Sequence, residues 1–395
     1  MDTKSGDFFK NARRSGLWPD AEAVHRSTLT KARKKVPWQF FEQILFKSVD
    51  VAYNCWPQSP DYLWHGMSVY AFDGSKYNLP ATDEIRKEFD PQSGLQYSGK
   101  GHYPQCLVST AYDVFRRFPI ARTVVGIKDG CEREEAKRMI PRIPSGNILL
   151  FDRGYPSYEF IHDLKTNYSG YFLFRCPGQS TFPAVEKFIK SKNGEAVIWV
   201  DPTNKYLMKI SRKDRKKIKP IKLRIIKLHS PDGTLSVLLT NLFDKTEFPK
   251  HEIIALYFRR WEIESYYRDE KIFLEIEKFH SKTCNGIRQE MFAAVIMSVI
   301  SRTLMMLSSH VFHSQVVEPQ FKNSIMALAS EAAVLVPADP EKAVNIFNEV
   351  LTEISRVKYY RSKSPRPSQL RVCKKPLNKW SVGKLKKALK KTASP

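Results

Sequence analysis

The spacing of apolar residues changes twice along the chain. Over residues 18–50 apolar side chains recur at helical spacing, and from residue 68 they form short runs separated by turn residues, which predicts strands. We expect these strands at 68–72, 105–112, 120–127, 147–151 and 170–174, with a short helix at 157–165. Helical spacing returns from Pro249 to about residue 357. Hairpin strands followed by a strand–helix–strand unit predict an α/β fold, a mixed sheet flanked by helices.

A different pattern of short strands fills residues 176–248, where Asn-Gly, Asp-Pro and Pro-Asp-Gly turns interrupt the apolar runs. We expect strands here at 196–200, 207–210, 223–228 and 235–240. The chain then divides into five predicted parts: a helical, basic N-terminal module at 1–60, the first part of a core at 61–175, a β-rich insertion at 176–248, a helical part of the core at 249–355 and a basic tail at 356–395.

Positive charge is concentrated in two segments of the chain. The 65 Lys and Arg exceed the 41 Asp and Glu by 24 charges. Residues 205–227 carry eleven basic side chains and one acid, and residues 356–395 carry fourteen and none, so the two segments hold the whole excess. Such segments bind a polyanion or are solvated surface. We expect DNA binding, with the small basic N-terminal helices contributing. The most closely spaced candidates are Arg212, Lys213, Arg215, Lys216 and Lys217.

Composition argues against several other classes of protein. None of the six cysteines forms a C-x-x-C pair, which argues against a zinc ribbon, a redox motif or a disulfide scaffold. The N-terminus has no apolar signal core, and the most apolar stretch, 291–307, contains Arg302 and is short for a membrane span. We therefore expect a cytoplasmic protein without membrane contact, associated with the nucleoid when it is bound to DNA.

Two aspartates follow apolar runs and precede a glycine. Asp73 is followed by Gly74, and Asp152 by Arg153 and Gly154. Carboxylates at the ends of neighbouring strands can meet above a sheet and supply the oxygen ligands that Mg²⁺ prefers. Each motif is also typical of a simple turn, so each aspartate taken alone is better explained as a turn residue.

Residues 257–271 contain neither Pro nor Gly, and the pattern predicts one continuous helix. At about 100° per residue, Tyr257, Arg260, Glu264 and Lys271 share an arc of about 60°. Glu262 and Glu270 fall on other faces of the same helix. Glu264 is therefore the acid that this helix would offer to a site, although an Arg260–Glu264 pair on a solvent-facing helix explains the charges equally well.

These residues resemble one known family. The pattern Tyr-x2-Arg-x3-Glu-x6-Lys at 257–271, with Trp261 after the arginine, is similar to the signature helix of the IS4-type DDE transposases. The strands that lead to Asp73 and Asp152 resemble the two earlier acidic motifs of that family, and the order Asp, Asp, Glu also matches. The resemblance covers roughly residues 60–310.

The resemblance implies an RNase H-like core with a β-strand insertion. Asp73, Asp152 and Glu264 would be the catalytic, metal-binding triad, holding two Mg²⁺ ions that Mn²⁺ could replace. Tyr257, Arg260, Trp261 and Lys271 would contact DNA. A tryptophan in the family's insertion stabilises a flipped base at a hairpin end, and both Trp199 and Trp261 are candidates for that role. The partners would be terminal inverted repeats, target DNA and a second copy of the chain.

The implied activity is metal-dependent cleavage at the ends of an insertion sequence followed by strand transfer into target DNA, with hairpin ends as one route. Two alternatives remain open. The first is a domesticated DNA-binding protein that has lost catalysis, although all three acids are present. The second is a metal-dependent nuclease on the same fold, which needs the same carboxylates but does not join DNA.

Overall fold

The structure is a computed structural model that describes residues 2–16, 18–89, 103–127, 130–177, 182–229, 235–312, 318–336 and 338–359. The chain divides into two compact units, Met1–Lys358 and Tyr359–Pro395. Nearly all of the predicted basic tail, from residue 360 on, lies outside the described residues. The description below concerns the first unit.

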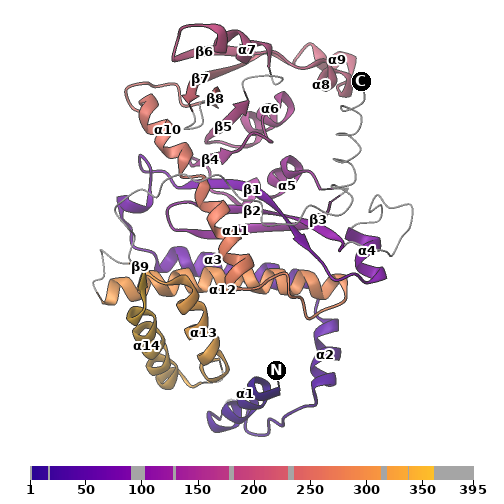
Figure 1. The fold of residues 1–395 in the computed structure, drawn as a ribbon, viewed down its shortest axis with the longest axis vertical. Helices are drawn as coiled ribbons and strands as arrows, with labels where there is room; N and C mark the ends of the chain where they lie inside the picture. The colour runs from indigo at the N-terminus through magenta and orange to yellow at the C-terminus, as the bar shows by residue number, and fades with distance from the viewer. Residues whose placement is uncertain are drawn as a thin grey trace, which may run out of the picture. The chain divides into compact units, whose positions relative to one another are not determined.

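A mixed sheet forms the centre of this unit (Figure 1). Its eight described strands lie in the order β3-β2-β1-β4-β5-β8-β7-β6. Strands β1, β4 and β5 run parallel to one another, and every other neighbouring pair for which we describe a register is antiparallel. The strands are β1 (Val69–Asn78), β2 (Gln105–Asp113), β3 (Phe118–Gly126), β4 (Ile148–Phe151), β5 (Tyr171–Pro177), β6 (Glu195–Val200), β7 (Ile221–His229) and β8 (Leu235–Thr240).

The first five strands confirm the predicted fold class. Each expected strand between residues 68 and 174 exists, and the order β3-β2-β1-β4-β5 of a hairpin pair joined to parallel strands is that of the expected RNase H-like core. Strands β6, β7 and β8 of the predicted insertion continue the same sheet through the β5–β8 pair. The boundaries of the five predicted parts stay a prediction.

One predicted strand of the insertion is wrong. Residues 207–210 belong largely to a helix, α8 (Asn204–Lys209), and not to a strand. The Thr203 side chain accepts a hydrogen bond from the Tyr206 backbone N–H and so caps the helix start. Tyr206 is buried against Tyr158, with ring centroids 5.2 Å apart, so a tertiary contact anchors this short helix.

Helices cover both faces of the sheet. Helices α5 (Glu132–Met139) and α6 (Tyr158–Asn167) pack on one face, and α11 (Trp261–Phe273) and α12 (Cys284–Val311) on the other. The remaining helices are α1 (Asp2–Arg14), α2 (Arg26–Lys35), α3 (Trp38–Cys55), η1 (Pro60–Tyr62), α4 (Asp83–Phe89), η2 (Ile140–Arg142), α7 (Pro183–Lys190), α9 (Arg212–Arg215), α10 (Lys250–Phe258), α13 (Phe321–Leu335) and α14 (Pro340–Arg356). Two-residue strands β9 (Glu318–Pro319) and β10 (Lys358–Tyr359) complete the elements of the described residues.

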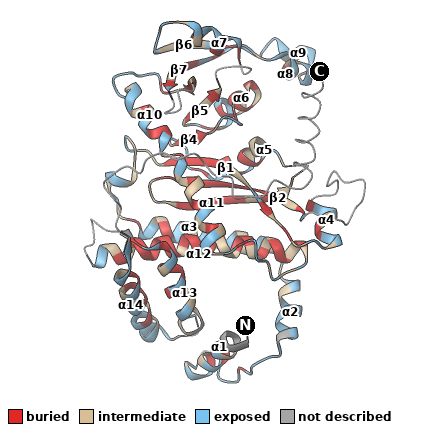
Figure 2. Cartoon of the chain, in the orientation of Figure 1, coloured by how far each residue is buried: buried red, intermediate tan, exposed pale blue. Residues whose placement is uncertain are grey.

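Helix α12 contains the most apolar stretch of the sequence. By length and composition it is the one helix in the described residues that could cross a membrane, with a mean hydropathy of 1.7 over its most apolar window. However, 72% of that window is buried against the sheet, α3, α13 and α14 (Figure 2). This is the pattern of a core helix, which is apolar on all sides because neighbours surround it.

Candidate active site

Strands β1 and β4 bring the two predicted aspartates together. Ala71 pairs with Leu150 in parallel register, and continuing that register by two residues places Asp73 opposite Asp152. Asp152 directly follows the end of β4, as predicted. The prediction that Asp73 ends its strand is wrong, because β1 continues to Asn78 and Asp73 pairs with Thr110 of β2. Asp73 therefore lies beside the space that opens where β4 stops.

The predicted single helix at 257–271 is two helices. Helix α10 ends at Phe258 and α11 begins at Trp261. Through the junction the backbone N–H groups of residues 259, 260, 262 and 263 bond carbonyls three residues back, which is the tighter 3₁₀ pattern. The chain stays right-handed here, so Tyr257, Arg260 and Glu264 remain on neighbouring positions despite the break.

Arg260 links the helix pair to the sheet. Its Nη2 donates to Glu264 Oε1 at 2.7 Å, and its Nη1 lies 3.8 Å from Asp73 Oδ2. Arg260 is 4% exposed, and its Nε and Nη1 have no hydrogen-bond partner among the described residues. Tyr257 is 1% exposed, and its hydroxyl lies beside the same guanidinium without a hydrogen bond of good geometry. Buried donors without acceptors are costly, which suggests a ligand that accepts from them.

The other three acids of α11 have different partners. Asp269 lies 3.7 Å from Arg302 of α12, and Glu262 and Glu270 lie on other faces, as the helical spacing predicted. Glu262 pairs with Arg117 at 3.5 Å, on the turn between β2 and β3. Glu270 is fully buried and pairs with Arg122 of β3 at 2.6 Å, and it accepts a hydrogen bond from the Tyr77 hydroxyl. Glu264 is thus the acid of this helix that lies near Asp73.

Further bonds fix α11 on β1. The Tyr267 hydroxyl donates to the Asp73 carbonyl oxygen at 2.8 Å. Lys271 Nζ donates to the Lys76 carbonyl oxygen at 2.8 Å and lies 4.3 Å from the centre of the Tyr77 ring. The predicted DNA-contacting lysine is therefore bound to the backbone of β1 in this structure, at the opposite end of α11 from Arg260.

Electrostatics show which acids surround Asp73. Burial, the largest cause, raises the pKa of Asp73 to about 7 against the opposing effect of Arg260, and the charges of Asp152, Glu264 and Glu132 raise it further. The pKa of Glu132 is itself raised, first by burial and then by Asp152. We call Asp73, Asp152, Glu264 and Glu132 the acid cluster.

Glu132 was missed by the sequence analysis. It opens α5 within the sequence Cys-Glu-Arg-Glu-Glu, and acids in a first helical turn are ordinary stabilisers of the helix dipole. Its two neighbours in that turn, unlike Glu132, have partners among the described residues: Lys137 for Glu134 and Arg138 for Glu135. Such pairing is visible only in the folded chain.

The acid cluster suits hard divalent cations by its chemistry. Asp73 and Glu264 lie next to the buried Arg260, Asp152 and Glu132 act on Asp73 through their charges, and carboxylate oxygen is the preferred ligand of Mg²⁺. Within the described residues no three His, Cys, Asp or Glu side chains already lie close enough together to hold an ion. The Arg260 guanidinium lies close to both Asp73 and Glu264 and offsets part of their negative charge.

The remaining predicted DNA-binding residues lie on the surface. Arg212, Lys213, Arg215, Lys216 and Lys217 are all exposed on or next to α9. Trp261, 42% exposed, lies with its ring 5.5 Å from the Arg260 guanidinium. Trp199 is 57% exposed on β6, the outermost strand beyond β7. Trp261 is thus the tryptophan that lies next to the acid cluster.

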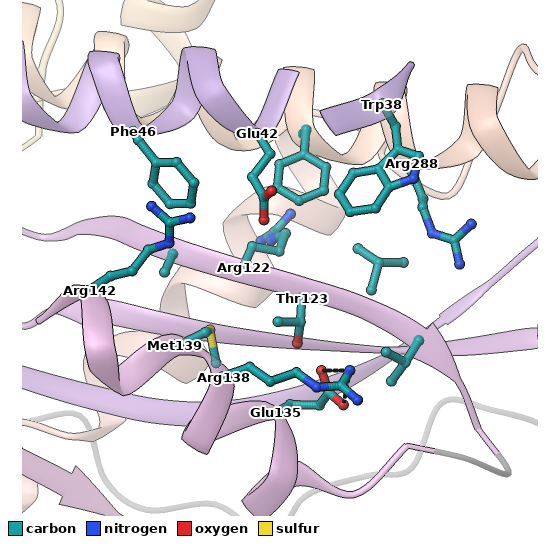
Figure 3. A pocket seen from close by; sticks show the side chains of 14 residues that line it. Trp38, Glu42, Phe46, Arg122, Thr123, Glu135, Arg138, Met139, Arg142 and Arg288 are labelled. Atoms are coloured by element: carbon teal, nitrogen blue, oxygen red, sulfur yellow. Dashed lines mark hydrogen bonds and ion pairs between the residues drawn. The ribbon is translucent and has the colours of Figure 1, made fainter. Parts of the chain in front are cut away.

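A separate cavity of about 380 Å³ lies at the edge of β3, between α3 and α12 on one side and α5 on the other (Figure 3). It contains no member of the acid cluster. Its arginines are already engaged: Arg138 pairs with Glu135, Arg288 with Glu88, and Arg142 stacks on the Phe46 ring. The cavity is therefore distinct from the candidate active site.

Comparison with known proteins decides the family. Residues 64–300 match the family described as "Transposase DDE domain". The chain belongs to the DDE transposases. The match contains Asp73, Asp152, Glu264 and the helix pair around Arg260. DDE transposase domains depend on metal ions and act on DNA.

Individual relatives agree with this family. The chain is 22% identical over 281 residues to "Transposase InsG for insertion sequence element IS4" of Escherichia coli (strain K12), covering 69% of this chain and 59% of InsG. It is 31% identical over 164 residues to "Putative transposase y4zB" of Sinorhizobium fredii (strain NBRC 101917 / NGR234), covering 40% of this chain and 43% of that protein. These relatives confirm the resemblance to IS4-type transposases. The chain spans about half their length.

Among solved structures, the chain is similar to the cryo-EM structure of the piggyBac transposase synaptic complex with hairpin DNA. The TM-score is 0.40 at 10% identity, over 76% of this chain and 59% of that one.

Proposed function

We propose that this DDE transposase cleaves DNA at the ends of an insertion sequence and joins the freed 3′ ends to target DNA. The observation that carries the proposal is the position of Arg260, which is buried between Asp73 and Glu264 and keeps two of its nitrogens without a hydrogen-bond partner among the described residues. Fixed donors among acids suit a site that must hold a phosphodiester and cations together.

The helix pair binds the DNA end in this proposal. The Nε and Nη1 of Arg260 and the hydroxyl of Tyr257 donate to oxygens of the phosphate at the cleaved bond. Trp261 provides an exposed ring beside them for the terminal base. Lys271 contacts the backbone of the DNA end after its Nζ leaves the Lys76 carbonyl, which costs one hydrogen bond at the surface.

Asp73, Asp152 and Glu264 hold the metal, which we propose to be two Mg²⁺ ions with Mn²⁺ as a substitute. When bound, the ions lower the pKa of the attacking water and stabilise the leaving 3′ oxygen. With cations held by Asp73, Asp152 and Glu264, Arg260 would no longer be needed to neutralise Asp73, and its guanidinium would be available to the phosphate. No covalent protein–DNA intermediate is needed, because the freed 3′-hydroxyl is the next nucleophile.

The exposed basic side chains of α9 and its neighbours bind phosphates along the DNA, independent of sequence. Because transposition joins two ends, the proposal includes a homodimer on paired inverted repeats. Sedimentation of the protein with one end and with two ends tests this stoichiometry: a complex with one protein copy per pair of ends contradicts it.

The proposal is tested with a duplex carrying the inverted repeat that flanks the gene. We expect Mg²⁺-dependent nicking, seen on a denaturing gel, and joining of a pre-cut 3′-hydroxyl end to plasmid DNA. Asp73→Ala, Asp152→Ala and Glu264→Ala should each abolish both reactions, whereas the control Glu262→Ala should retain them, since Glu262 pairs with Arg117.

The same assay separates the rival functions. Cleavage without joining of the pre-cut end would identify a nuclease, and binding of the duplex without any Mg²⁺-dependent cleavage would identify a non-catalytic DNA-binding protein. Hairpin ends on the excised DNA, formed before joining and then re-opened to free the 3′-hydroxyl, distinguish the hairpin route from direct joining.

A further inference from the structure

Glu132 reaches into the acid cluster across two glycines. A Cβ atom built at Gly74 would lie 2.6 Å from Glu132 Oε1, and one built at Gly154 would lie 3.6 Å from Glu132 Oε2 and 3.2 Å from Asp152 Oδ1. The Glu132 and Asp152 carboxylates therefore approach the same point beside Gly154. Gly74 directly follows Asp73, so Glu132 lies against the glycine of each predicted acidic motif.

This close approach explains why the first motif contains glycine at position 74. Neither Gly74 nor Gly154 has the positive φ that would demand glycine in a turn. Gly74 lies inside strand β1, where a side chain would normally strengthen packing. The space above it is taken by the side chain of Glu132, so we attribute the glycine to the close approach of that carboxylate.

The structure provides Glu132 with no ordinary partner. Within the described residues it forms no hydrogen bond or ion pair, unlike Glu134 and Glu135 in the same turn. Lys76 and Arg133 act on it only through longer-range charge. A half-buried carboxylate held against another carboxylate repels it, which is unfavourable unless a cation lies between them.

A second, independent feature indicates a ligand at the same place. The Tyr257 hydroxyl is buried and has no hydrogen-bond partner of good geometry among the described residues; the Arg260 and Arg175 charges and, more weakly, the Asp152 charge affect its pKa. Tyr257 belongs to α10, next to the helix that carries Glu264, whereas Glu132 belongs to α5. Within the described part of the chain, an unpartnered buried hydroxyl and an unpartnered carboxylate thus both act electrostatically on Asp152.

We propose that Glu132 is a fourth carboxylate ligand of the active site and shares a divalent cation with Asp152. The inference rests on the proposed function, because it adds a ligand to the metal site described there. The assignment gives Glu132 a different task from the three acids of the family motif: it approaches Asp152 from the opposite side of the sheet to Glu264 and closes the site on that side.

Binding of Mn²⁺ to the full chain without DNA tests the proposal, with free Mn²⁺ counted by its electron paramagnetic resonance signal. Glu132→Gln keeps the size of the side chain and removes its charge, and it should weaken binding of one ion at least about tenfold. Glu134→Gln, in the same helical turn, is the matched control and should bind as the unchanged protein does. Thermal unfolding in EDTA checks that both variants fold.

Gly74→Ala provides a second variant that keeps all four acids. Its methyl group would displace the flexible end of Glu132, so it should weaken Mn²⁺ binding to a similar degree. In the double variant with Glu132→Gln the losses should not add, since both act through the same carboxylate. Additive losses would show that Gly74→Ala acts through Asp73 instead and would remove this support.

The outcomes separate this inference from the proposed function. If Asp73→Asn and Asp152→Asn weaken Mn²⁺ binding but Glu132→Gln does not, the fourth ligand is wrong and the metal site stands. If the unchanged protein binds no Mn²⁺, both are wrong. If Glu132→Gln and Asp152→Asn each lose the same ion, the shared site is established.

Discussion

At the scale of single residues, the buried negative charge of Asp73 lowers the free energy of unfolding of the chain without bound metal. Its pKa is raised to about 7 by burial and by neighbouring acids, so between about pH 4 and 7 the folded chain holds a proton that the unfolded chain has released. Stability therefore falls as the pH rises through this window. Above about pH 7 Asp73 is charged in the folded chain, and the whole destabilisation by its buried charge is present. Removing the charge should relieve the cost.

We accordingly expect Asp73→Asn to stabilise the chain in EDTA by roughly 1–3 kcal/mol at about pH 8 and by little at about pH 4. Urea unfolding at the two pH values measures the difference. Glu264→Gln is a useful comparison, because Glu264 has Arg260 as a direct partner, and this variant should be destabilised or unchanged. If Asp73→Asn changes the free energy of unfolding equally at both pH values, the buried charge of Asp73 is not the cause of the change.

DNA cleavage should depend on the shape of the Arg260 side chain as well as on its positive charge. Its guanidinium spans Asp73 and Glu264, and lysine has a single nitrogen that cannot reach both while donating to a phosphate. Arg260→Lys should therefore lower the rate of single-turnover DNA cleavage at least about tenfold while the chain stays folded. Wild-type rates in Arg260→Lys would reduce Arg260 to a source of positive charge.

At the scale of elements, the pair Arg122–Glu270 holds α11 on the sheet. Both side chains are fully buried, and Tyr77 and Tyr266 complete the hydrogen bonds around them. Breaking such a pair leaves an uncompensated buried charge, so Glu270→Gln should cost about 3–5 kcal/mol of unfolding free energy in urea. The exposed pair Glu353–Arg356 is the control, and Glu353→Gln should cost less than about 1 kcal/mol.

A second substitution distinguishes charge from packing at this position. Replacing both partners, Arg122→Met with Glu270→Leu, removes the unpaired charge and should recover much of the loss. A double variant no more stable than Glu270→Gln would mean that the hydrogen bonds to Tyr77 and Tyr266 dominate.

Regular elements were predictable because their apolar patterns repeat. Strand β4 is a run of buried apolar residues, and its neighbour β1 has the same pattern from Val69 to Phe72. Beyond Phe72 the pattern fails, because β1 continues past the end of β4 and carries Asp73 and Gly74 toward the site. The break between α10 and α11 has no Pro or Gly to mark it, and the compact 3₁₀ bonds that form it appear only in the fold.

The site was predictable to the extent that its residues share a local motif. Asp73, Asp152, Glu264, Arg260 and Tyr257 lie in recognisable spacing, and the structure brings them together. Glu132 has no such motif, and its proximity to Asp152 depends on the packing of α5 over β1 and on two glycines that leave room for it. Side chains that meet only through tertiary packing leave no periodic signal in the sequence.

At the scale of the whole molecule, positive charge should govern the affinity for DNA. The basic residues of α9 and its neighbours are exposed, and none of them belongs to the acid cluster. They are therefore suited to DNA phosphates beyond the cleaved bond. The logarithm of the association constant for DNA falls linearly with the logarithm of salt concentration. The slope should become shallower by about 0.9 for each DNA phosphate that a variant no longer neutralises. The neutralised double variant K213Q/K216Q should therefore have a slope shallower by up to about 2.

The matched control neutralises two exposed lysines on other helices, Lys322 of α13 and Lys342 of α14, with the same change in net charge. If DNA follows the surface of α9, K322Q/K342Q should leave the slope nearly unchanged, and cleavage at low salt should be retained in both variants because the acid cluster is intact. If the salt-dependence slopes of the two variants are equal, net charge alone attracts DNA. The proposal that DNA binds along the surface of α9 would then be wrong.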